Sequence, residues 1–241
     1  MWKRQLIRYW RSRGRMIGAL GQPVLFFLAL GFGFGPVYAK AGGGDYIQFL
    51  TPGIMAMTIL FTSMFTGMEV IWDRQFGFLK ETMVAPVPRW QIMLGKTFGG
   101  ATIAVLQSLI VFFITLFFGF SPNWYLFPVT LIFMFLLACG FTAFGIAIAS
   151  QLEDMQAFPI IMNFMIMPIF FLSGALFPLN NLPKAVDIVA TLDPLSYGVD
   201  GLRGTLINGA HYGLTLDFLV ISFIALLFVS VGTYLFAKIE V

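Results

Sequence analysis

Apolar positions in this chain form long uncharged runs that are separated by short polar segments. A membrane-spanning helix needs about 20 mainly apolar residues, and the uncharged run 97–152 is too long for one such helix. The turn-forming residues at 120–124 (FSPNW) divide this run into two. The pattern predicts an all-α polytopic membrane protein with six spans, at 16–36, 46–68, 97–119, 125–149, 155–177 and 217–237.

Composition supports a single transmembrane domain over residues 1–241. Hydrophobic residues make up 59% of the chain and charged residues 10%, and the mean hydropathy is +0.90. Soluble domains carry roughly 25% charged residues. The motif Val37-Tyr38-Ala39 resembles a signal-peptide cleavage site, but the uncharged run before it is longer than a signal core. We therefore expect a first span there.

The first 15 residues predict an amphipathic helix that lies at the membrane interface. Four arginines, Arg4, Arg8, Arg11 and Arg15, have spacings that place them on one helical face. Trp2 falls on the other side, with further apolar residues. A basic face opposite an apolar face is typical of a helix on a bilayer surface.

The distribution of basic residues predicts the orientation. Eleven Lys and Arg residues fall in 1–15, in 73–96 and at Lys238, and three fall in the segments on the other side. Cytoplasmic segments carry the excess of basic residues. Both termini and the segment 73–96 are therefore expected in the cytoplasm, and 178–216 outside.

The residues give no constellation for catalysis. Cys139 and His211 are the only residues of their types, and neither belongs to a metal-binding motif. The sequence at 95–97 (GKT) resembles the end of a phosphate-binding loop, but Trp90 stands where that loop needs glycine. No nucleic-acid-binding motif occurs. Any nucleotide energy must therefore come from another chain.

The segment 73–96 is the longest charged passage between two predicted spans. Phe76, Leu79 and Met83 have the spacing of an apolar stripe on a helix that ends at Pro86 and Pro88. A short amphipathic helix of this kind suits docking into a groove on a soluble protein, although a simple connector between spans explains it equally. The residues expected at the helix start or on its polar face are Asp73, Arg74 and Glu81.

Two blocks of sequence resemble the permeases of ABC transporters of the type-two family, which export drugs and polysaccharides. The first block consists of 72–74 (WDR), Gly77, Leu79, Glu81, 84–89 (VAPVPR) and 94–96 (LGK). The second consists of 171–174 (FLSG), 177–178 (FP), 182–183 (LP), 193–197 (DPLSY) and 201–203 (GLR).

This resemblance implies a dimer of permeases in a prokaryotic inner membrane, with one cytosolic ATPase subunit bound to each copy. The ATPase, not this chain, would bind ATP and Mg. The loop 73–96 would be the coupling helix that docks into the ATPase. Its implied contact residues are Asp73, Arg74, Phe76, Gly77, Leu79, Lys80, Glu81, Pro86 and Arg89.

The resemblance also implies that 178–216 forms two short re-entrant helices, near 183–192 and 194–208, which cap the translocation path from outside. The implied cap residues are Ser173, Gly174, Phe177, Pro178, Pro194, Tyr197 and Arg203.

The substrate path is expected along the second and fifth spans, by the same resemblance. Soft and aromatic side chains accommodate varied apolar ligands, although such residues more often serve helix packing and lipid contact. The candidates are Phe61, Phe65, Phe158, Met162 and Met165. An uncharged path favours hydrophobic or amphipathic compounds such as drugs. A polysaccharide or a lipid-linked glycan is the alternative substrate, and an ATP-independent channel or scramblase is the alternative machine.

Overall fold

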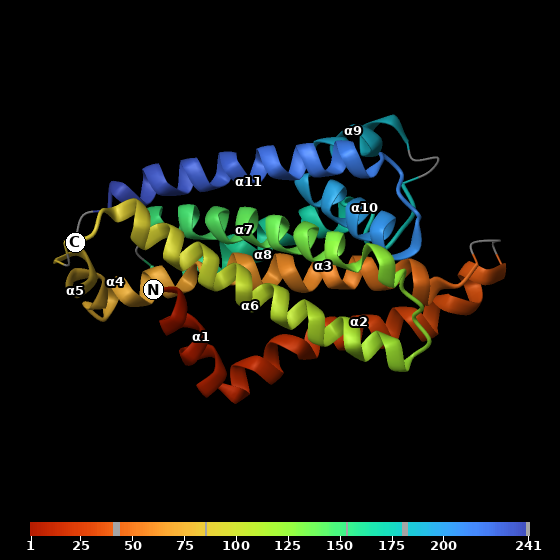
Figure 1. Cartoon of the computed structure of the whole chain (residues 1–241), viewed down its shortest axis with the longest axis horizontal. Helices are drawn as coiled ribbons and strands as arrows, with labels where there is room; N and C mark the ends of the chain where they lie inside the picture. Colours follow the sequence, from red (N-terminus) through yellow and green to blue (C-terminus); the bar gives the residue numbers. More distant parts are fainter. Residues whose placement is uncertain (41–43, 85, 153, 180–182, 240–241) are drawn as a thin grey trace.

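The computed structural model describes the chain outside residues 41–43, 85, 153, 180–182 and 240–241, and its side chains outside those of Arg15, Lys80 and Met83. The described chain forms one elongated bundle of helices (Figure 1). The helices are α1 (Trp2–Arg11), α2 (Arg13–Lys40), α3 (Tyr46–Thr66), α4 (Met68–Gln75), α5 (Phe78–Val84), α6 (Arg89–Phe117), α7 (Phe127–Gln151), α8 (Ala157–Leu172), α9 (Lys184–Leu192), α10 (Pro194–Ile207) and α11 (Leu214–Ala237).

Five helical segments are long and apolar enough to cross a membrane. They are Met16–Lys40, Tyr46–Gln75, Arg89–Phe117, Trp124–Gln151 and Leu214–Ala237, the fourth including the short 3-10 turn before α7. The helix α8 is apolar but shorter. The expectation of an all-helical membrane protein is therefore confirmed at the level of fold class, with five candidate spans in the described chain.

Several helix boundaries differ from those expected. The first span continues through Pro36 to Lys40, and the third begins at Arg89, directly after Pro88, which caps it. The fifth ends at Leu172, because Gly174 adopts a left-handed conformation with φ +73° that a helix cannot accommodate. The early start of α6 has a functional consequence, because it places Lys96 within a long helix.

The helices α3 and α7 form the centre of the bundle, and small residues let them cross closely. A Cβ atom on Gly67 would lie 2.3 Å from the carbonyl oxygen of Gly145, and one on Gly145 would lie 2.5 Å from that of Met64. Small residues such as Gly67 and Gly145 therefore allow this close helix crossing. On the opposite side of α7, Gly232 of α11 meets the backbone of Ala143.

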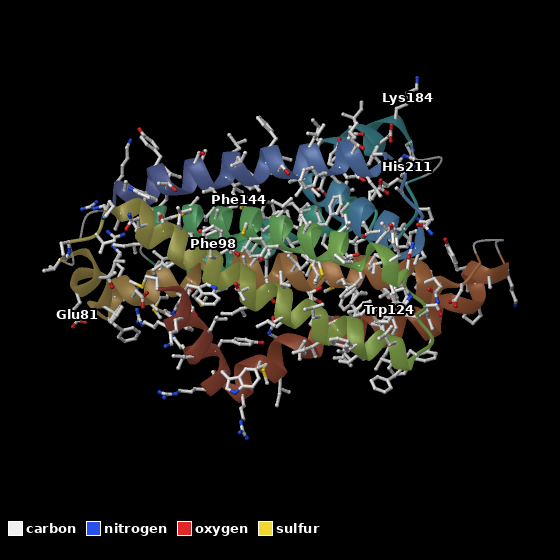
Figure 2. The ribbon with its side chains drawn as sticks, viewed as in Figure 1. Glu81, Phe98, Trp124, Phe144, Lys184 and His211 are labelled. Atoms are coloured by element: carbon white, nitrogen blue, oxygen red, sulfur yellow. The ribbon has the colours of Figure 1, made fainter. Side chains whose placement is uncertain are left out.

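The two ends of the bundle differ in character. The N-terminus and the end of α11 lie at the end of the bundle that carries α4 and α5, whereas α9 lies towards the opposite end (Figure 1). Figure 2 shows Glu81 at the first end, and Lys184 and His211 at the other. The segments 1–15 and 73–96, which were predicted to share one side of the membrane, thus lie at one end of the molecule.

Candidate functional site

The segment 73–84 is divided between two helices. Gly77, with φ +74°, separates α4 from α5, and Phe76 forms the end of α4. The expected single helix with Phe76, Leu79 and Met83 on one stripe is therefore wrong. Phe76 is largely exposed, whereas Leu79 is fully buried and anchors α5 against the bundle. Glu81 is exposed on α5, and Pro86 is exposed just beyond it.

Asp73 does not cap a helix, contrary to expectation. It lies inside α4, and its side chain is only 7% exposed. The ammonium group of Lys96 on α6 donates a hydrogen bond to its carboxylate, and the Lys96 side chain is 4% exposed. Sequence reasoning missed this pair because both residues were assigned to a solvated loop. The direct role of Asp73 is to hold α4 against α6.

The same carboxylate also binds the N-terminal helix. Nη2 of Arg4 and Nη1 of Arg8 lie 3.7 Å and 3.8 Å from Oδ1 of Asp73. The guanidinium group of Arg4 stacks over the ring of Phe78 on α5, 3.5 Å from its centroid. A neighbouring hydrogen bond of 3.3 Å runs from Gln5 to Glu69 on α4. Two arginines of the predicted interfacial face therefore contact protein, and α1 is tied to both α4 and α5.

The helix α1 also packs closely on α6. A Cβ atom on Gly99 would lie 1.7 Å from the side-chain oxygen of Gln5, so a larger residue there would displace the Gln5 side chain. Nε1 of Trp2 donates a hydrogen bond of 3.0 Å to Oγ1 of Thr102. Of the other predicted basic residues of this helix region, Arg11 is exposed, and the side chain of Arg15 lies outside the described part of the structure.

Two other predicted coupling residues have different surroundings. Nη1 of Arg89 donates hydrogen bonds of 2.6 Å and 3.1 Å to the carbonyl oxygens of Ala237 and Ile239, which fastens the end of α11 to the start of α6. Arg74 is half-buried on α4. The side chain of Lys80 lies outside the described part of the structure. Among the predicted coupling residues of α5 whose side chains the structure describes, Glu81 thus offers an exposed charge.

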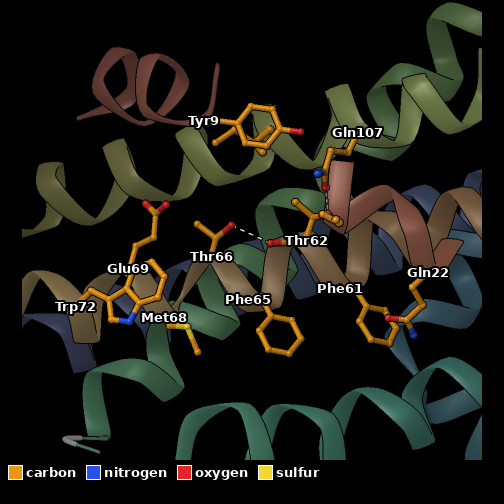
Figure 3. A pocket seen from close by; sticks show the side chains of 13 residues that line it. Tyr9, Gln22, Phe61, Thr62, Phe65, Thr66, Met68, Glu69, Trp72 and Gln107 are labelled. Carbon is orange, nitrogen blue, oxygen red and sulfur yellow. Dashed lines mark hydrogen bonds between the residues drawn. The ribbon is translucent and has the colours of Figure 1, made fainter. Parts of the chain in front are cut away.

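A cavity of about 340 Å³ lies between the N-terminal half of α2 and the helices α3 and α6, next to α1. Ligand sites typically have volumes of about 300–1,000 Å³. Phe61 and Phe65 of α3 supply apolar surface, and Thr62 donates a hydrogen bond to Gln107 of α6 (Figure 3). Polar groups also come from Gln22. The cavity therefore combines an apolar surface with a set of hydrogen-bonding groups.

The predicted path residues are divided between this cavity and the protein core. Phe61 and Phe65 line the cavity. Phe158 of α8 is fully buried and contacts Phe65, with 6.4 Å between ring centroids. Met162 is also fully buried, and Met165 is half-buried; neither lines the cavity. Sequence reasoning singled out neither Tyr9 nor Glu69; the docking of α1 brings Tyr9 to the cavity, and Glu69 lines it from α4.

The predicted cap residues gather where α10 meets the end of α8. Nη2 of Arg203 donates a hydrogen bond of 3.1 Å to the carbonyl oxygen of Gly174. Its guanidinium group lies 4.0 Å from the ring centroid of Phe49 on α3. Burial lowers the pKa of Arg203 to about 10, so the side chain stays cationic at neutral pH. Arg203 thus joins α10 to both α8 and α3.

The other predicted cap residues have structural surroundings of several kinds. Ser173 is buried and donates a hydrogen bond to Phe170, while the hydroxyl group of Tyr197 donates one of 2.8 Å to the carbonyl oxygen of Thr191. Pro194 is the first residue of α10. Phe177 is exposed and Pro178 is half-buried. In the part of the chain that the structure describes, no group of three or more His, Cys, Asp or Glu is placed to hold a metal ion.

Asp193 caps α10 and predicts a pH dependence of stability. Its Oδ1 accepts the N–H of Leu195 at 2.9 Å. Burial raises its pKa from 3.8 to about 7, and the bond from Leu195 opposes the rise. The folded chain therefore binds this proton more tightly than the unfolded chain, so the residue destabilises the fold as pH rises between these values.

Asp193→Asn keeps a capping oxygen and removes the charge. We expect the variant to melt higher than the unaltered chain in detergent at about pH 8, by roughly 2–4 °C for each kcal/mol gained. At about pH 4 the two chains should melt alike, because the native carboxyl is then protonated. A difference in melting temperature that does not change with pH would contradict the assignment.

These features define a class of protein before any comparison. Long apolar helices form the bundle, a charged short helix lies at one end, and a cavity with both apolar and polar surface lies between helices. The chain is a multi-pass membrane protein with the features of a transport subunit.

Comparison with known proteins identifies the family. Residues 1–207 match the family of ABC-2 type transporters. The chain is 32% identical over 212 residues to the transport permease ycf38 of Cyanophora paradoxa. The aligned residues make up 83% of this chain and 71% of the relative. The chain is 23% identical over 233 residues to nodulation protein J of Rhizobium leguminosarum bv. viciae, covering 93% and 90%. The chain belongs to the ABC-2 type transporter family, as the sequence motifs indicated.

Proposed function

We propose that this chain is the permease of an ATP-driven exporter that moves hydrophobic or amphipathic compounds out of the cell. A separate cytosolic ATPase binds and hydrolyses ATP with Mg, and α5 is the coupling helix on which it docks. The observation that carries this proposal is the contact of α5 and α4 with the bundle. Phe78 of α5 stacks on Arg4, and Arg4 and Lys96 both bind Asp73 of α4. A movement of α5 is therefore transmitted to α1 and α6.

The proposed topology has six crossings, which are the five candidate spans and α8. An even number of crossings returns the chain to its starting side, which agrees with the N-terminus and the end of α11 at one end of the bundle (Figure 1). A length of 16 residues gives α8 about 24 Å; it would cross with the help of the residues that follow it. The termini, α4 and α5 would face the cytoplasm of a prokaryotic cell, and α9 and α10 would form the re-entrant external cap.

The proposed assembly contains two copies of this chain and two ATPase subunits. The helix α8 supports a second copy, because its outer face exposes large apolar side chains. Ile160 is 71% exposed and Phe164 is 80% exposed. An apolar face on a membrane helix meets either lipid or another helix. A homodimer along α8 would place the two cavities in one assembly.

The cavity between α2, α3 and α6 is the proposed substrate site. Its phenylalanines suit an apolar tail or ring system, and the groups of Gln22, Thr62 and Gln107 suit a polar head. The same polar groups favour the second candidate function, which is export of a lipid-linked glycan whose sugar passes through while its tail stays in the bilayer. Both substrates are amphipathic, and a direct comparison of the two separates them.

Filling the cavity tests this assignment. Ala19 of α2 lines the cavity, and Ala29 lies on the same helix but not on its wall. We expect Ala19→Phe to weaken substrate-stimulated ATP hydrolysis by the reconstituted complex about tenfold, which corresponds to about 1.4 kcal/mol of lost binding. The matched control Ala29→Phe should leave it unchanged.

ATP hydrolysis is measured with a fluorescent amphipathic drug and, in parallel, with a lipid-linked oligosaccharide. Stimulation by each compound is expressed relative to basal hydrolysis without it. A loss confined to the oligosaccharide would select the glycan alternative. Equal activity of Ala19→Phe and Ala29→Phe with both compounds would contradict the assignment of the cavity as the substrate site.

A further inference from the structure

A buried pair of carboxyl groups lies where α10 meets the start of α11. Asp217 is in the first turns of α11 and has no exposed surface, and neither of its carboxyl oxygens has a hydrogen-bond partner among the described residues. The side chain of Asp200 on α10 is 2% exposed and lies within hydrogen-bonding reach of it. Burying a polar group without a partner destabilises the fold, and more so when the group is charged. Two carboxylates only accept hydrogen bonds, so the pair needs a donor or a cation from another source.

The two carboxyl groups have unequal surroundings. The carboxylate of Asp200 accepts the backbone N–H of His211 at 2.7 Å and 2.8 Å and that of Tyr212 at 2.7 Å. Arg203, one turn further along α10, is close enough to interact with Asp200 electrostatically. Asp200 therefore has both donors and a nearby cation for a negative charge. Asp217 has no such donors, so a negative charge on it is opposed by its burial and by Asp200.

Apart from Arg203, the groups described near the pair provide no side chain that is cationic at every pH. The hydroxyl groups of Tyr197 and Tyr212 interact with Asp217, and Asp187 acts on Tyr212. His211 is exposed and contacts the ring of Tyr212. Arg203 is directed to Gly174 and Phe49. One bound proton on Asp217 removes the second negative charge and gives Asp217 a hydrogen bond to the carboxylate of Asp200.

We propose that Asp200 and Asp217 form a proton-binding site that holds one proton between them and fastens α10 and the 208–213 loop to α11. The proton sits on Asp217 and is donated to the carboxylate of Asp200. When the external solution becomes alkaline the proton leaves to water, two adjacent negative charges remain, and the start of α11 separates from α10. The site would make the packing of the external cap depend on external pH. This proposal does not depend on the transported substrate or on an ATPase partner.

Infrared spectroscopy of the purified chain in lipid nanodiscs tests the bound proton directly. The carbonyl stretch of a protonated carboxyl group is separate from that of a carboxylate. Asp193→Asn serves as the background, because Asp193 also binds a proton near neutral pH. In that background we expect a protonated-carboxyl band at about neutral pH that disappears with Asp217→Asn. Asp187→Asn and His211→Gln, which change neighbouring groups, should leave the band in place.

Hydrogen exchange provides a second measurement on the unaltered chain. The amides of His211 and Tyr212 should lose protection by at least about tenfold, relative to their intrinsic exchange rates, as the pair loses its proton. Asp217→Asn, which cannot ionise, should keep that protection at high pH. If this variant does not fold, the pH titration of the unaltered chain decides alone.

Two results would overturn the proposal. One is a band unaffected by Asp217→Asn, or amide protection that is constant across the titration. The other is a band that disappears at fixed pH when Na⁺ or Ca²⁺ is added, which would assign the site to a metal cation.

Discussion

Asp73→Ala should be the most damaging single substitution at the end of the bundle that carries α4 and α5. Removing this carboxylate leaves Lys96 buried without its partner and removes the anion that holds Arg4 and Arg8. Breaking a buried ion pair by removing one partner costs about 3–5 kcal/mol. At roughly 2–4 °C per kcal/mol, the melting temperature in detergent should fall by roughly 6–20 °C.

The design of this experiment uses the asymmetry of the cluster. Lys96→Met should cost less than Asp73→Ala, because Arg4 and Arg8 still accompany the carboxylate. Glu81→Ala, an exposed acidic residue on the adjacent helix, should leave the melting temperature unchanged. The double variant Asp73→Leu/Lys96→Leu should recover part of the loss, because no unpaired charge remains. Equal melting of Asp73→Ala and the unaltered chain would contradict the role assigned to the cluster.

Gly67→Ala and Gly145→Ala should each disrupt the crossing of α3 and α7. The added methyl group would lie within 2.5 Å of a backbone oxygen in both cases, so the helices themselves must separate. Overpacking of this kind costs about 1–3 kcal/mol and occasionally more, and we expect values at the upper end because no flexible side chain can move aside. The measurement is thermal unfolding in detergent together with the yield of folded protein.

Gly33→Ala is the matched control, because nothing lies within 4 Å of a Cβ atom at Gly33 on α2. This substitution should be neutral or stabilise the chain by up to about 1 kcal/mol, since alanine favours helix more than glycine does. If Gly33→Ala and Gly67→Ala had the same effect, the close crossing of α3 and α7 would be contradicted.

Much of the fold follows from the length of the apolar runs. A long uncharged apolar run is stable only in a membrane or a deep core. There a helix satisfies the backbone hydrogen bonds internally, so the helices form where the apolar runs are. Boundaries are less predictable, because charged residues such as Lys96 extend a helix when tertiary contacts satisfy them. The break at Gly77 was also missed. Its signal was a glycine between two phenylalanines, which the apolar spacing outweighed.

The candidate sites were also predicted only in part. Phe61 and Phe65 were predicted from their type and position, and both line the cavity. The cluster of Arg4, Arg8, Asp73 and Lys96 was not predicted, because its members come from three helices far apart in sequence. Periodicity describes one helix at a time, whereas this cluster needs the contact of α4 with α6 and the docking of α1 beside it.

Co-purification shows whether a separate ATPase binds α5 and drives this chain. The tagged chain would be isolated from its native cells in mild detergent, and ATP hydrolysis would be measured on the eluate. The matched control is Lys184→Ala/Asp187→Ala, which changes two exposed charges on α9, towards the opposite end of the bundle.

We expect a stoichiometric ABC-class ATPase with the unaltered chain and with the α9 control. We expect its loss with Arg74→Ala/Glu81→Ala, in a chain that still folds and inserts in the membrane. An ATPase that remains bound to the Arg74→Ala/Glu81→Ala variant would contradict the docking role of α5. An intact, folded chain that elutes without any ATPase would contradict the ATP-driven function itself.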